Sequence, residues 1–449
     1  QFKATKVPLI DIARELQVRY ILQGSVRQSF ENIRVNVQLV DTKSNQEIWA
    51  HRFDDNIENI FKLQDQIITK ILNKLNLDTG KKTVSKRSTS NIEAYDYFLR
   101  AEHRRLNARG SKSGFKILEF YRRAIELDPL YVAAYTGLAR EALTNWQLGD
   151  SEVMPATAWK KLVYESAGKA LELDSKNTDA LGIIGLLQAI SGEHDAGIAS
   201  VKSAVAINPS NPQLHADLAA VLSYGGSHDA ALQSINAAID RHATPPSAYL
   251  DERSRIYFFL GQFEKALIDA ESDQNISDTI NFSVFIHGAL NNRELAQRFV
   301  GVRLQARPWE NQASYRVLFA YYRRFEDIEK IIDSAARAGM PRFAYGFDPG
   351  TSKPLDNIAI SKLTSAGPWQ GNTHDGSEFY QQFTAGNGVT TRTADSTMSG
   401  AYHIENNKLC IAPQSVVLDL ADCGYIYPVG ADNSYTWVTL DGVYRFSVE

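Results

Sequence analysis

The chain has 449 residues, of which 44% are hydrophobic and 22% are charged, and its formal net charge is −4. This balance is typical of a soluble globular protein, and it excludes the strongly basic surface with which a nucleic-acid-binding protein neutralises phosphates. The length exceeds what one hydrophobic core holds, so about three domains of roughly 100–200 residues each are expected.

The sequence contains no predicted membrane span. Its longest apolar run, around Leu181–Ile190, reaches only about half of the ~20 residues that a spanning helix requires. No signal peptide is visible either. The chain opens on Gln1 rather than on Met, and in the middle of a structural pattern, so we expect it to be part of a longer protein.

Residues 1–77 predict a small α+β domain. Apolar residues at helical spacing follow Pro8, and three runs typical of strands come next, at Tyr20–Arg27, Ile33–Asp41 and Glu47–Phe53. Apolar and polar side chains alternate in the middle run, which indicates an antiparallel sheet with one buried face. A long amphipathic helix follows, so we expect the helices to lie on one side of the sheet.

The block "DIARELQVRYILQGSVRQS…IRVNVQLVDTKSNQEIWAHRFD…IFKLQDQII" resembles the amino-terminal domain of TolB and its relatives. The order, the spacing and the turns of the elements agree over about 60 residues. The resemblance implies a TolB-like α/β sheet domain. In that family one or more strand–helix units precede this block, so we expect the sheet to be incomplete at its amino-terminal side.

After a polar linker at residues 78–90, residues 91–349 predict an all-α array of helical hairpins. Gly192, Gly226 and Gly261 are 34 and 35 residues apart, and small residues recur at fixed offsets from each of them. This period is typical of tetratricopeptide (TPR) repeats, in which stacked helical pairs form a solenoid. Helical periodicity continues to the end of the region, which predicts six or seven helical pairs.

Two of the predicted turns contain the pattern Gly-x-His-Asp-Ala, and both His and Asp are common metal ligands. The third repeat, however, has Phe263 where the other two have His194 and His228. The position therefore predicts a packing residue at a hairpin turn rather than one half of a metal site.

The predicted solenoid is the most informative feature for function. Its concave face is built from the first helix of each pair, and positions three or four apart on that helix point into the groove. The groove candidates are Gln213, Ala216, Ala220 and Tyr224 in one repeat, and Asp251, Arg255, Phe258 and Phe259 in the next. Aromatic and Arg side chains at such positions anchor a peptide or a partner protein. The alternative is that Phe258 and Phe259 only pack against the next helical pair.

Residues 350–366 predict a second linker, and residues 367–449 predict a small all-β domain. Turn dipeptides separate seven or eight short runs typical of strands, which favours an antiparallel barrel or sandwich. This domain has nine acidic and three basic residues. It also holds both cysteines of the chain, Cys410 and Cys423, which either pair across neighbouring strands, implying an oxidising compartment, or remain two buried free thiols.

The sequence lacks the common motifs of catalysis: a glycine-rich phosphate loop, His-Glu-x-x-His, Gly-x-Ser-x-Gly and Cys-x-x-Cys. We therefore expect no enzyme activity, no cofactor and no metal in this chain. A TolB-like domain followed by TPR repeats resembles the carboxy-terminal half of certain bacterial regulators. Their amino-terminal half is a class III adenylate/guanylate cyclase or a winged-helix (CadC-like) DNA-binding domain.

This resemblance implies a non-catalytic, partner-binding region of a membrane-anchored signalling protein, located in the periplasm, with a cytoplasmic location as the alternative. Two other functions stay open: an assembly scaffold of the cell envelope, and a small-ligand carrier or hydrolase built on the β domain. A cyclase or winged-helix domain upstream favours signalling, whereas a pocket with converging polar groups between the strands favours the small ligand. The predicted fold class is multidomain α+β.

Overall fold

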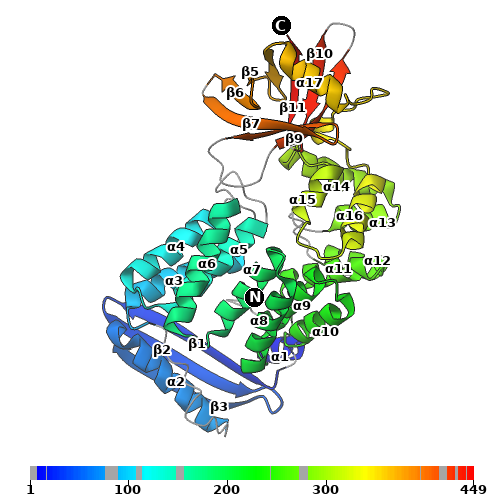
Figure 1. The fold of residues 1–449 in the computed structure, drawn as a ribbon. Helices are drawn as coiled ribbons and strands as arrows, with labels where there is room; N and C mark the ends of the chain where they lie inside the picture. The colour runs from blue at the N-terminus through cyan, green and yellow to red at the C-terminus, as the bar shows by residue number, and fades with distance from the viewer. Residues whose placement is uncertain are drawn as a thin grey trace. The chain divides into compact units, whose positions relative to one another are not determined.

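In the computed structural model, the described residues are 8–16, 18–75, 89–107, 114–147, 156–242, 244–272, 282–394, 396–413, 422–429, 433–440 and 442–448. The chain divides into two compact units, Gln1–Val221 with Gln233–Leu250, and Leu222–Leu232 with Asp251–Glu449. The division passes through three helices of the helical array: α9 (Pro212–Tyr224), α10 (His228–Ile239) and α11 (Ser247–Phe259). Figure 1 shows the elements in chain order. No helix among the described residues is long and apolar enough to cross a membrane.

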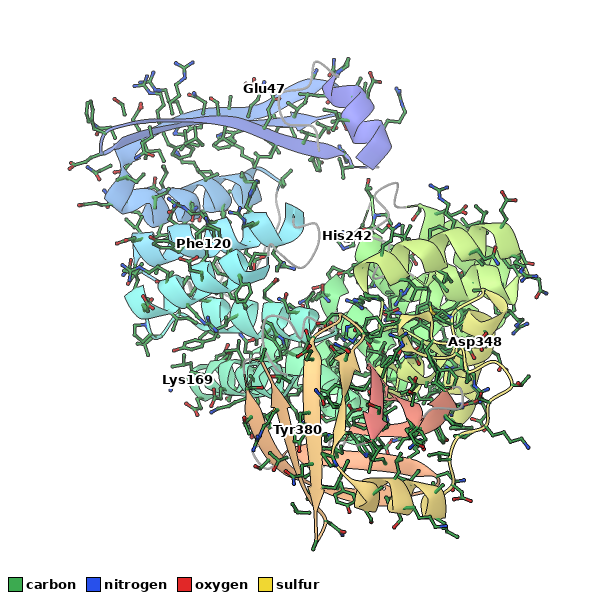
Figure 2. The ribbon with its side chains drawn as sticks, turned by 90° about the horizontal axis from the view of Figure 1, so that it is seen from above. Glu47, Phe120, Lys169, His242, Asp348 and Tyr380 are labelled. Atoms are coloured by element: carbon green, nitrogen blue, oxygen red, sulfur yellow. A yellow bond between two sulfur atoms is a disulfide. The ribbon has the colours of Figure 1, made fainter. Side chains whose placement is uncertain are left out.

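A three-stranded antiparallel sheet, in the order β1-β2-β3, forms the amino-terminal part of the first unit. Its elements are α1 (Leu9–Leu16), β1 (Tyr20–Ser29), β2 (Asn32–Asp41), β3 (Gln46–Asn56), the 3-10 turn η1 (Ile57–Asn59) and α2 (Ile60–Lys74). The alternating apolar residues of β2 form the predicted buried face of the sheet, where Ile33 and Val37 pack with Phe53 and with Leu63 of α2. Strand β1, by contrast, is exposed along almost its whole length. Glu47 lies on β3, an edge strand of this sheet (Figure 2).

Helices α3 to α16 form seven successive helical pairs in the described part of the chain, and these are the TPR-type repeats that the sequence predicts. Besides α9, α10 and α11, they are α3 (Ile92–Asn107), α4 (Gly114–Leu127), α5 (Val132–Gln147), α6 (Ala156–Leu173), α7 (Thr178–Ile190), α8 (His194–Ile207), α12 (Phe263–Glu271), α13 (Ser283–Ala289), α14 (Arg293–Ala306), α15 (Gln312–Leu318) and α16 (Phe325–Arg337). Residues 148–155, between α5 and α6, lie outside the described residues.

The turns within three of these pairs require glycine. Gly192, Gly226 and Gly261 have φ angles of +90°, +83° and +75°, in the left-handed region that a Cβ atom disfavours. The turn between α13 and α14 solves the same problem with Asn291, whose φ is +56°. Asn tolerates this region better than most residues, so the repeat persists although its glycine is missing.

Helix α13 holds a buried histidine, His287. His287 is 1% exposed, and neither of its ring nitrogens bonds to another described residue. Its ring stacks on Phe299 at a centroid distance of 5.3 Å. Burial lowers the pKa of His287, because a charged imidazolium would lose its hydration there.

We expect this histidine to make the second unit less stable at acidic pH. The folded-state pKa lies below the unfolded value of about 6.5, so the unfolded chain binds the proton first as the pH falls. The contribution of neutral His287 to the free energy of unfolding is fully present above about pH 6.5. It is lost progressively as the pH falls from that value to the lower folded-state pKa. The measurement is hydrogen–deuterium exchange of α13 at about pH 7.5 and about pH 5.5, corrected for the intrinsic exchange rate.

A His287→Phe chain should lose part of this acid sensitivity, whereas His374→Phe, a change at an exposed histidine, should keep it. Equal acid sensitivity in wild type and His287→Phe would contradict the explanation.

Eight antiparallel strands close into a barrel at the carboxy-terminal end, with each strand beside its sequence neighbour and β11 paired with β4. They are β4 (Trp369–Thr373), β5 (Glu378–Thr384), β6 (Gly388–Thr393), β7 (Thr397–Glu405), β8 (Lys408–Pro413), β9 (Asp422–Val429), β10 (Ser434–Val438) and β11 (Val443–Val448). The interior is filled by large side chains, among them Trp369, Phe379, Trp437 and Phe446. The barrel therefore has a packed core.

The two predicted linkers have different outcomes. Residues 350–366 contain a helix, α17 (Asn357–Ala366), whose first turn is capped by Asp356, and Ile360 and Leu363 of this helix enter the barrel core. The linker prediction needs correction here, because a helix of 10 residues with two buried apolar positions gives almost no periodic signal. The other predicted linker, 78–90, lies outside the described residues except for its last two.

Candidate partner-binding site

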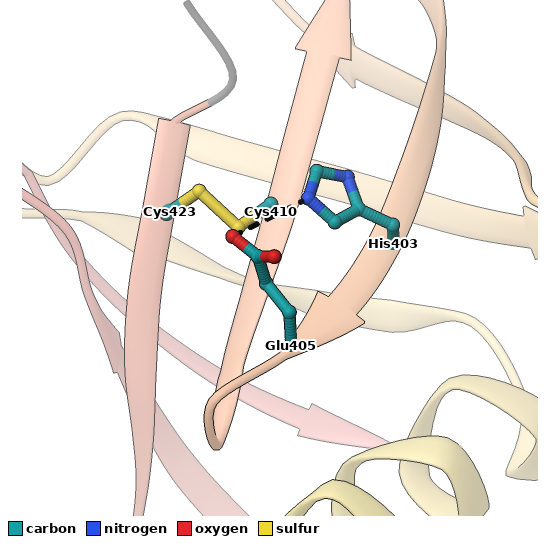
Figure 3. Close-up of a disulfide and its surroundings, with 4 residues drawn as sticks. All are labelled: His403, Glu405, Cys410 and Cys423. Carbon is teal, nitrogen blue, oxygen red and sulfur yellow. Dashed lines mark ion pairs between the residues drawn. A yellow bond between two sulfur atoms is a disulfide. The ribbon is translucent and has the colours of Figure 1, made fainter.

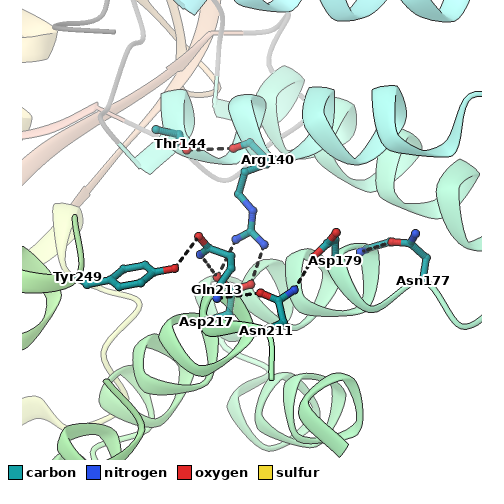
Figure 4. Close-up of polar contacts among 9 residues, drawn as sticks. Arg140, Thr144, Asn177, Asp179, Asn211, Gln213, Asp217 and Tyr249 are labelled. Atoms are coloured by element: carbon teal, nitrogen blue, oxygen red, sulfur yellow. Dashed lines mark hydrogen bonds and ion pairs between the residues drawn. The ribbon is translucent and has the colours of Figure 1, made fainter. Parts of the chain in front are cut away.

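Polar side chains from the first helices of several successive pairs meet in the first unit (Figure 4). Arg140 comes from α5, Gln213 and Asp217 come from α9, and Tyr249 comes from α11. Hydrogen bonds join all four, and we call them the Arg140–Asp217 cluster. Its members belong to three different repeats, so the cluster exists only when the repeats stack.

Two sequence features place these side chains. Gln213 and Asp217 are four residues apart on α9, so they share one face of that helix. Gly182 of α7 leaves room for the carboxylate, since a Cβ atom at this glycine would lie 2.8 Å from Asp217 Oδ2. The starts of α7 and α9 are also linked, because the side chain of Asn211 donates to Asp179 at 3.3 Å.

The centre of the cluster is a two-pronged ion pair. Arg140 Nη1 donates to Asp217 Oδ1 and Nη2 donates to Oδ2, each at 2.7 Å. Gln213 Nε2 donates to Asp217 Oδ1 at 2.9 Å, and the Tyr249 hydroxyl donates to Gln213 Oε1 at 3.4 Å. The Asp217 side chain is 3% exposed and that of Arg140 is 18% exposed. Such parallel hydrogen bonds between charged groups are among the strongest in proteins.

The charges of the pair stabilise each other. Burial lowers the pKa of Arg140, but the charge and hydrogen bonds of Asp217 outweigh that effect and hold the pKa above its ordinary value. Burial, and then the charge of Asp217, raise the pKa of Tyr249. At neutral pH the cluster is therefore a charged pair beside a protonated phenol and a neutral amide.

This arrangement is suited to binding. Gln213 and Arg140 are partly exposed, and amide and guanidinium groups recognise the backbone or carboxylates of a peptide by hydrogen bonding. The four residues do not combine an activated nucleophile with a general base in the way that covalent catalysis requires.

Of the predicted groove residues, Gln213 lies in the cluster, and three others meet in the second unit. Tyr224 lies edge-on to Tyr322 at a centroid distance of 5.4 Å. Phe258 lies edge-on to Phe282 at 5.3 Å, and the Arg255 guanidinium lies over the Phe282 ring at 5.7 Å. Together these five side chains form an aromatic core around one arginine.

Burial corrects the prediction for two of these residues. Tyr224 is 2% exposed and Phe258 is 0% exposed, so both side chains pack between helices and neither is open to a partner. For Phe258 this agrees with the alternative interpretation, in which the side chain packs against the next helical pair. Arg255 and Asp251 are half-buried, and Arg255 forms an ion pair with Glu252 at 3.0 Å.

Sequence reasoning missed three members of the cluster: Arg140, Asp217 and Tyr249. Asp217 had a usable signal, because it follows Gln213 by one helical turn. Arg140 had no such signal in the sequence, since it precedes Asp217 by 77 residues and only the stacking of the repeats brings the two together.

The two repeated histidines occupy equivalent structural positions. Helices α8, α10 and α12 begin at His194, His228 and Phe263, which confirms the alignment of the repeats. His228 is hydrogen-bonded to Asp327 at 2.9 Å and to Ser223 at 3.3 Å. This Ser–His–Asp row resembles the order in a hydrolase, but all three residues are at most 5% exposed. A substrate has no access to them, so the row stabilises the fold.

A pocket of about 590 Å³ lies beside the barrel wall, between residues 347–352 and the strands β9, β10, β11 and β4. Side chains alternate along these strands, so Tyr427 and Thr436 point away from the core that contains Ile426 and Trp437. The pocket therefore lies on the outer surface of the barrel wall and not in the barrel interior.

The two cysteines form a disulfide, and they occupy directly opposite positions on β8 and β9. The two cysteines are 13 positions apart in the sequence, and part of the segment between them lies outside the described residues.

No model of a protein family matches this chain. A segment of 150 residues, 32% of the chain, is 34% identical to the protein named "Putative adenylate cyclase 3" of Rhizobium meliloti and covers 25% of it. A segment of 120 residues, 27% of the chain, is 31% identical to "Transcriptional regulator HilA" of Salmonella typhimurium and covers 21% of it. The matched part therefore spans a quarter or less of each of these relatives.

Solved structures, two of them described as TPR proteins, are also similar to parts of the chain. A thermophilic TPR protein of Thermus thermophilus is 15% identical with a TM-score of 0.35, over 44% of this chain and 98% of that one. The pilF protein of Pseudomonas aeruginosa is 15% identical with a TM-score of 0.33, over 53% and 99%. YrrB, described as a TPR protein with an unusual peptide-binding site, is 17% identical with a TM-score of 0.25, over 50% and 97%. Because all three TM-scores are below 0.5, we draw no conclusion from these likenesses.

Proposed function

We propose that this chain is the partner-binding region of a bacterial signalling protein, and that it holds a peptide or protein segment against the first-helix face around the Arg140–Asp217 cluster. The observation that carries the proposal is the assembly of this cluster from the first helices of three repeats. Stacked helical pairs build extended binding surfaces from these helices, and partly exposed polar side chains there supply specificity.

Three observations support the signalling context and the location in this proposal. The order of a TolB-like sheet and TPR repeats resembles the sensory half of membrane-anchored cyclases and winged-helix regulators. Parts of the chain are also similar to a protein named as a putative adenylate cyclase and to one named as a transcriptional regulator. The disulfide suits an oxidising compartment, so we place this region in the periplasm.

A site-specific crosslinking experiment tests the binding surface. The gene is expressed at its native locus with a photoreactive benzoyl-phenylalanine at Gln213, or at Lys202, an exposed residue of the second helix α8, as the matched control. Irradiation of living cells should give one dominant adduct from position 213 and none from position 202. The crosslinked segment is identified by mass spectrometry, synthesised, and titrated against the purified chain.

Arg140→Gln should weaken binding of that synthetic segment, by about tenfold if one charged hydrogen bond is lost. Adducts of equal yield at both positions, or a segment that binds Arg140→Gln as tightly as wild type, would contradict the proposed surface. The signalling context is tested separately by reading the gene upstream of the codon for Gln1. A cyclase or winged-helix domain supports it, and a bare signal peptide favours an envelope scaffold.

A further inference from the structure

A row of metal-ligand side chains crosses three neighbouring strands of the barrel. His403 of β7 pairs with Cys410 of β8, and Cys410 pairs with Cys423 of β9. Glu405 follows His403 by two residues, so it lies on the same face of β7. The chain neighbours of Cys410 on β8 are part of the barrel core, so this row lies on the outer face.

Three of the four side chains in this row are close enough to share one ion. One ligand atom from each of His403, Glu405 and Cys410 lies within 4.8 Å of the others, and this is the one such group of three among the described residues. His403 Nε2 is 3.8 Å from Glu405 Oε1. Figure 3 shows the imidazole and the carboxylate beside the disulfide. The side chains of His403 and Glu405 are 52% and 58% exposed, whereas Cys410 is 0% exposed, so solvent reaches the imidazole and the carboxylate but not the Cys410 sulfur.

In the oxidised chain the sulfur atoms are not ligands, because a metal binds the thiolate and the disulfide contains none. We propose that reduction of the Cys410–Cys423 disulfide creates a site for Zn²⁺ or a similar divalent ion, with the two thiolates, the His403 imidazole and the Glu405 carboxylate as ligands. Two sulfur ligands, one nitrogen and one oxygen match the tetrahedral preference of zinc.

The reaction needs a reductant, which we take to be a dithiol. Its two sulfur atoms become a disulfide, the Sγ–Sγ bond of the protein breaks, and two electrons and two protons pass to Cys410 and Cys423. Binding of Zn²⁺ then forms two Zn–S bonds and releases these two protons to solvent. Oxidation reverses the sequence and expels the ion.

The sheet register allows this change without moving the strands. Cys410 and Cys423 lie directly opposite each other on β8 and β9, with their Cα atoms 3.9 Å apart. Two thiolates on one zinc ion, each at about 2.3 Å, are roughly 3.8 Å apart in a tetrahedral site. Side-chain rotation at Cys410 and Cys423 therefore suffices. Lys408, which pairs with Glu405, holds its ammonium over the Tyr425 ring at 5.0 Å.

The test uses Co²⁺ as a spectroscopic probe for Zn²⁺, on the full 449-residue chain. The protein is reduced with dithiothreitol, freed of it by gel filtration under argon, and titrated with Co²⁺. The expected result is one tightly bound ion per chain, with the thiolate charge-transfer band and the intense visible bands of tetrahedral cobalt. Zn²⁺ should abolish both. The oxidised chain should bind no Co²⁺ with this spectrum.

Three variants identify the ligands. Cys423→Ser keeps one of the two thiolates, so it should lose about half of the charge-transfer intensity. His403→Ala should weaken binding by more than the ~10–100-fold that loss of an outer-shell partner costs. His374→Ala, at an exposed histidine in the turn after β4, should bind like wild type.

Three results would overturn the proposal: no stoichiometric Co²⁺ binding after reduction, unchanged affinity in His403→Ala, or loss of hydrogen-exchange protection in β7, β8 and β9 on reduction. The last result would mean that the ligands are not held together by an intact sheet.

Discussion

Replacing Arg140 with Met is expected to destabilise the first unit by about 3–5 kcal/mol. The substitution keeps most of the packed side chain but leaves the Asp217 carboxylate, which is 3% exposed, without its positive partner. Gln213 alone cannot compensate a buried negative charge, because an amide supplies one hydrogen bond and no counter-charge. Since the two units need not unfold together, the measurement is hydrogen–deuterium exchange of α5, α7 and the part of α9 that belongs to the first unit.

Two further variants separate loss of the ion pair from a general loss of charge. Arg123→Met breaks an exposed ion pair with Glu126, and it should have little effect because solvent screens that pair. Adding Asp217→Leu to Arg140→Met removes the stranded charge, so it should recover a large part of the lost protection. If Arg140→Met were no more harmful than Arg123→Met, the cluster would not hold the repeats together as described.

Replacing Trp369 with Ala is expected to cost the barrel about 3–5 kcal/mol, close to the whole stability of a domain of this size. Trp369 is 0% exposed, and its ring stacks on Phe446 at a centroid distance of 4.1 Å. Its Nε1–H donates to the carbonyl of Leu363 at 3.3 Å, so the substitution also loosens α17. The expected observation is loss of exchange protection in β4, β11 and α17, with α5 and α7 unchanged.

Tyr380→Ala serves as the matched aromatic control. Tyr380 is half-buried and is adjacent on β5 to the core residue Phe379, so it points to the opposite face of the strand. It should cost less than half as much as Trp369→Ala. Equal effects of the two substitutions would mean that the barrel interior is not the main source of its stability.

The parts of the fold that the sequence predicts correctly are those encoded by local patterns. Alternation predicts the buried face of β2, and the spacing of Gly192, Gly226 and Gly261 predicts the helical pairs, because a turn in the left-handed region needs glycine in each copy. The pattern fails where another residue performs the same task, as Asn291 does, and where the buried apolar positions of a helix are too few to show its period, as in α17.

The candidate site was predicted only in part because it depends on contacts between repeats. Gln213 could be found from its position on a first helix. Arg140 and Tyr249 reach it from other repeats, and no local pattern encodes that meeting. For Phe258 the prediction was wrong in the opposite sense: it was expected in the open groove, but its side chain fills the space between helices. Which side of a first helix is open depends on how its neighbours stack, and this is a tertiary property.

Closure of the barrel has a consequence for how molecules of this protein associate with one another. Every described strand from β4 to β11 has a hydrogen-bonded neighbour on both sides, whereas β1 and β3 each have one side unpaired among the described residues. On β1 the side chains of Leu22 and Val26 are 49% and 64% exposed. An unpaired apolar strand is a template for joining another chain by backbone hydrogen bonds. In concentrated solution, intermolecular β-sheet should therefore grow from the amino-terminal sheet and spare the barrel.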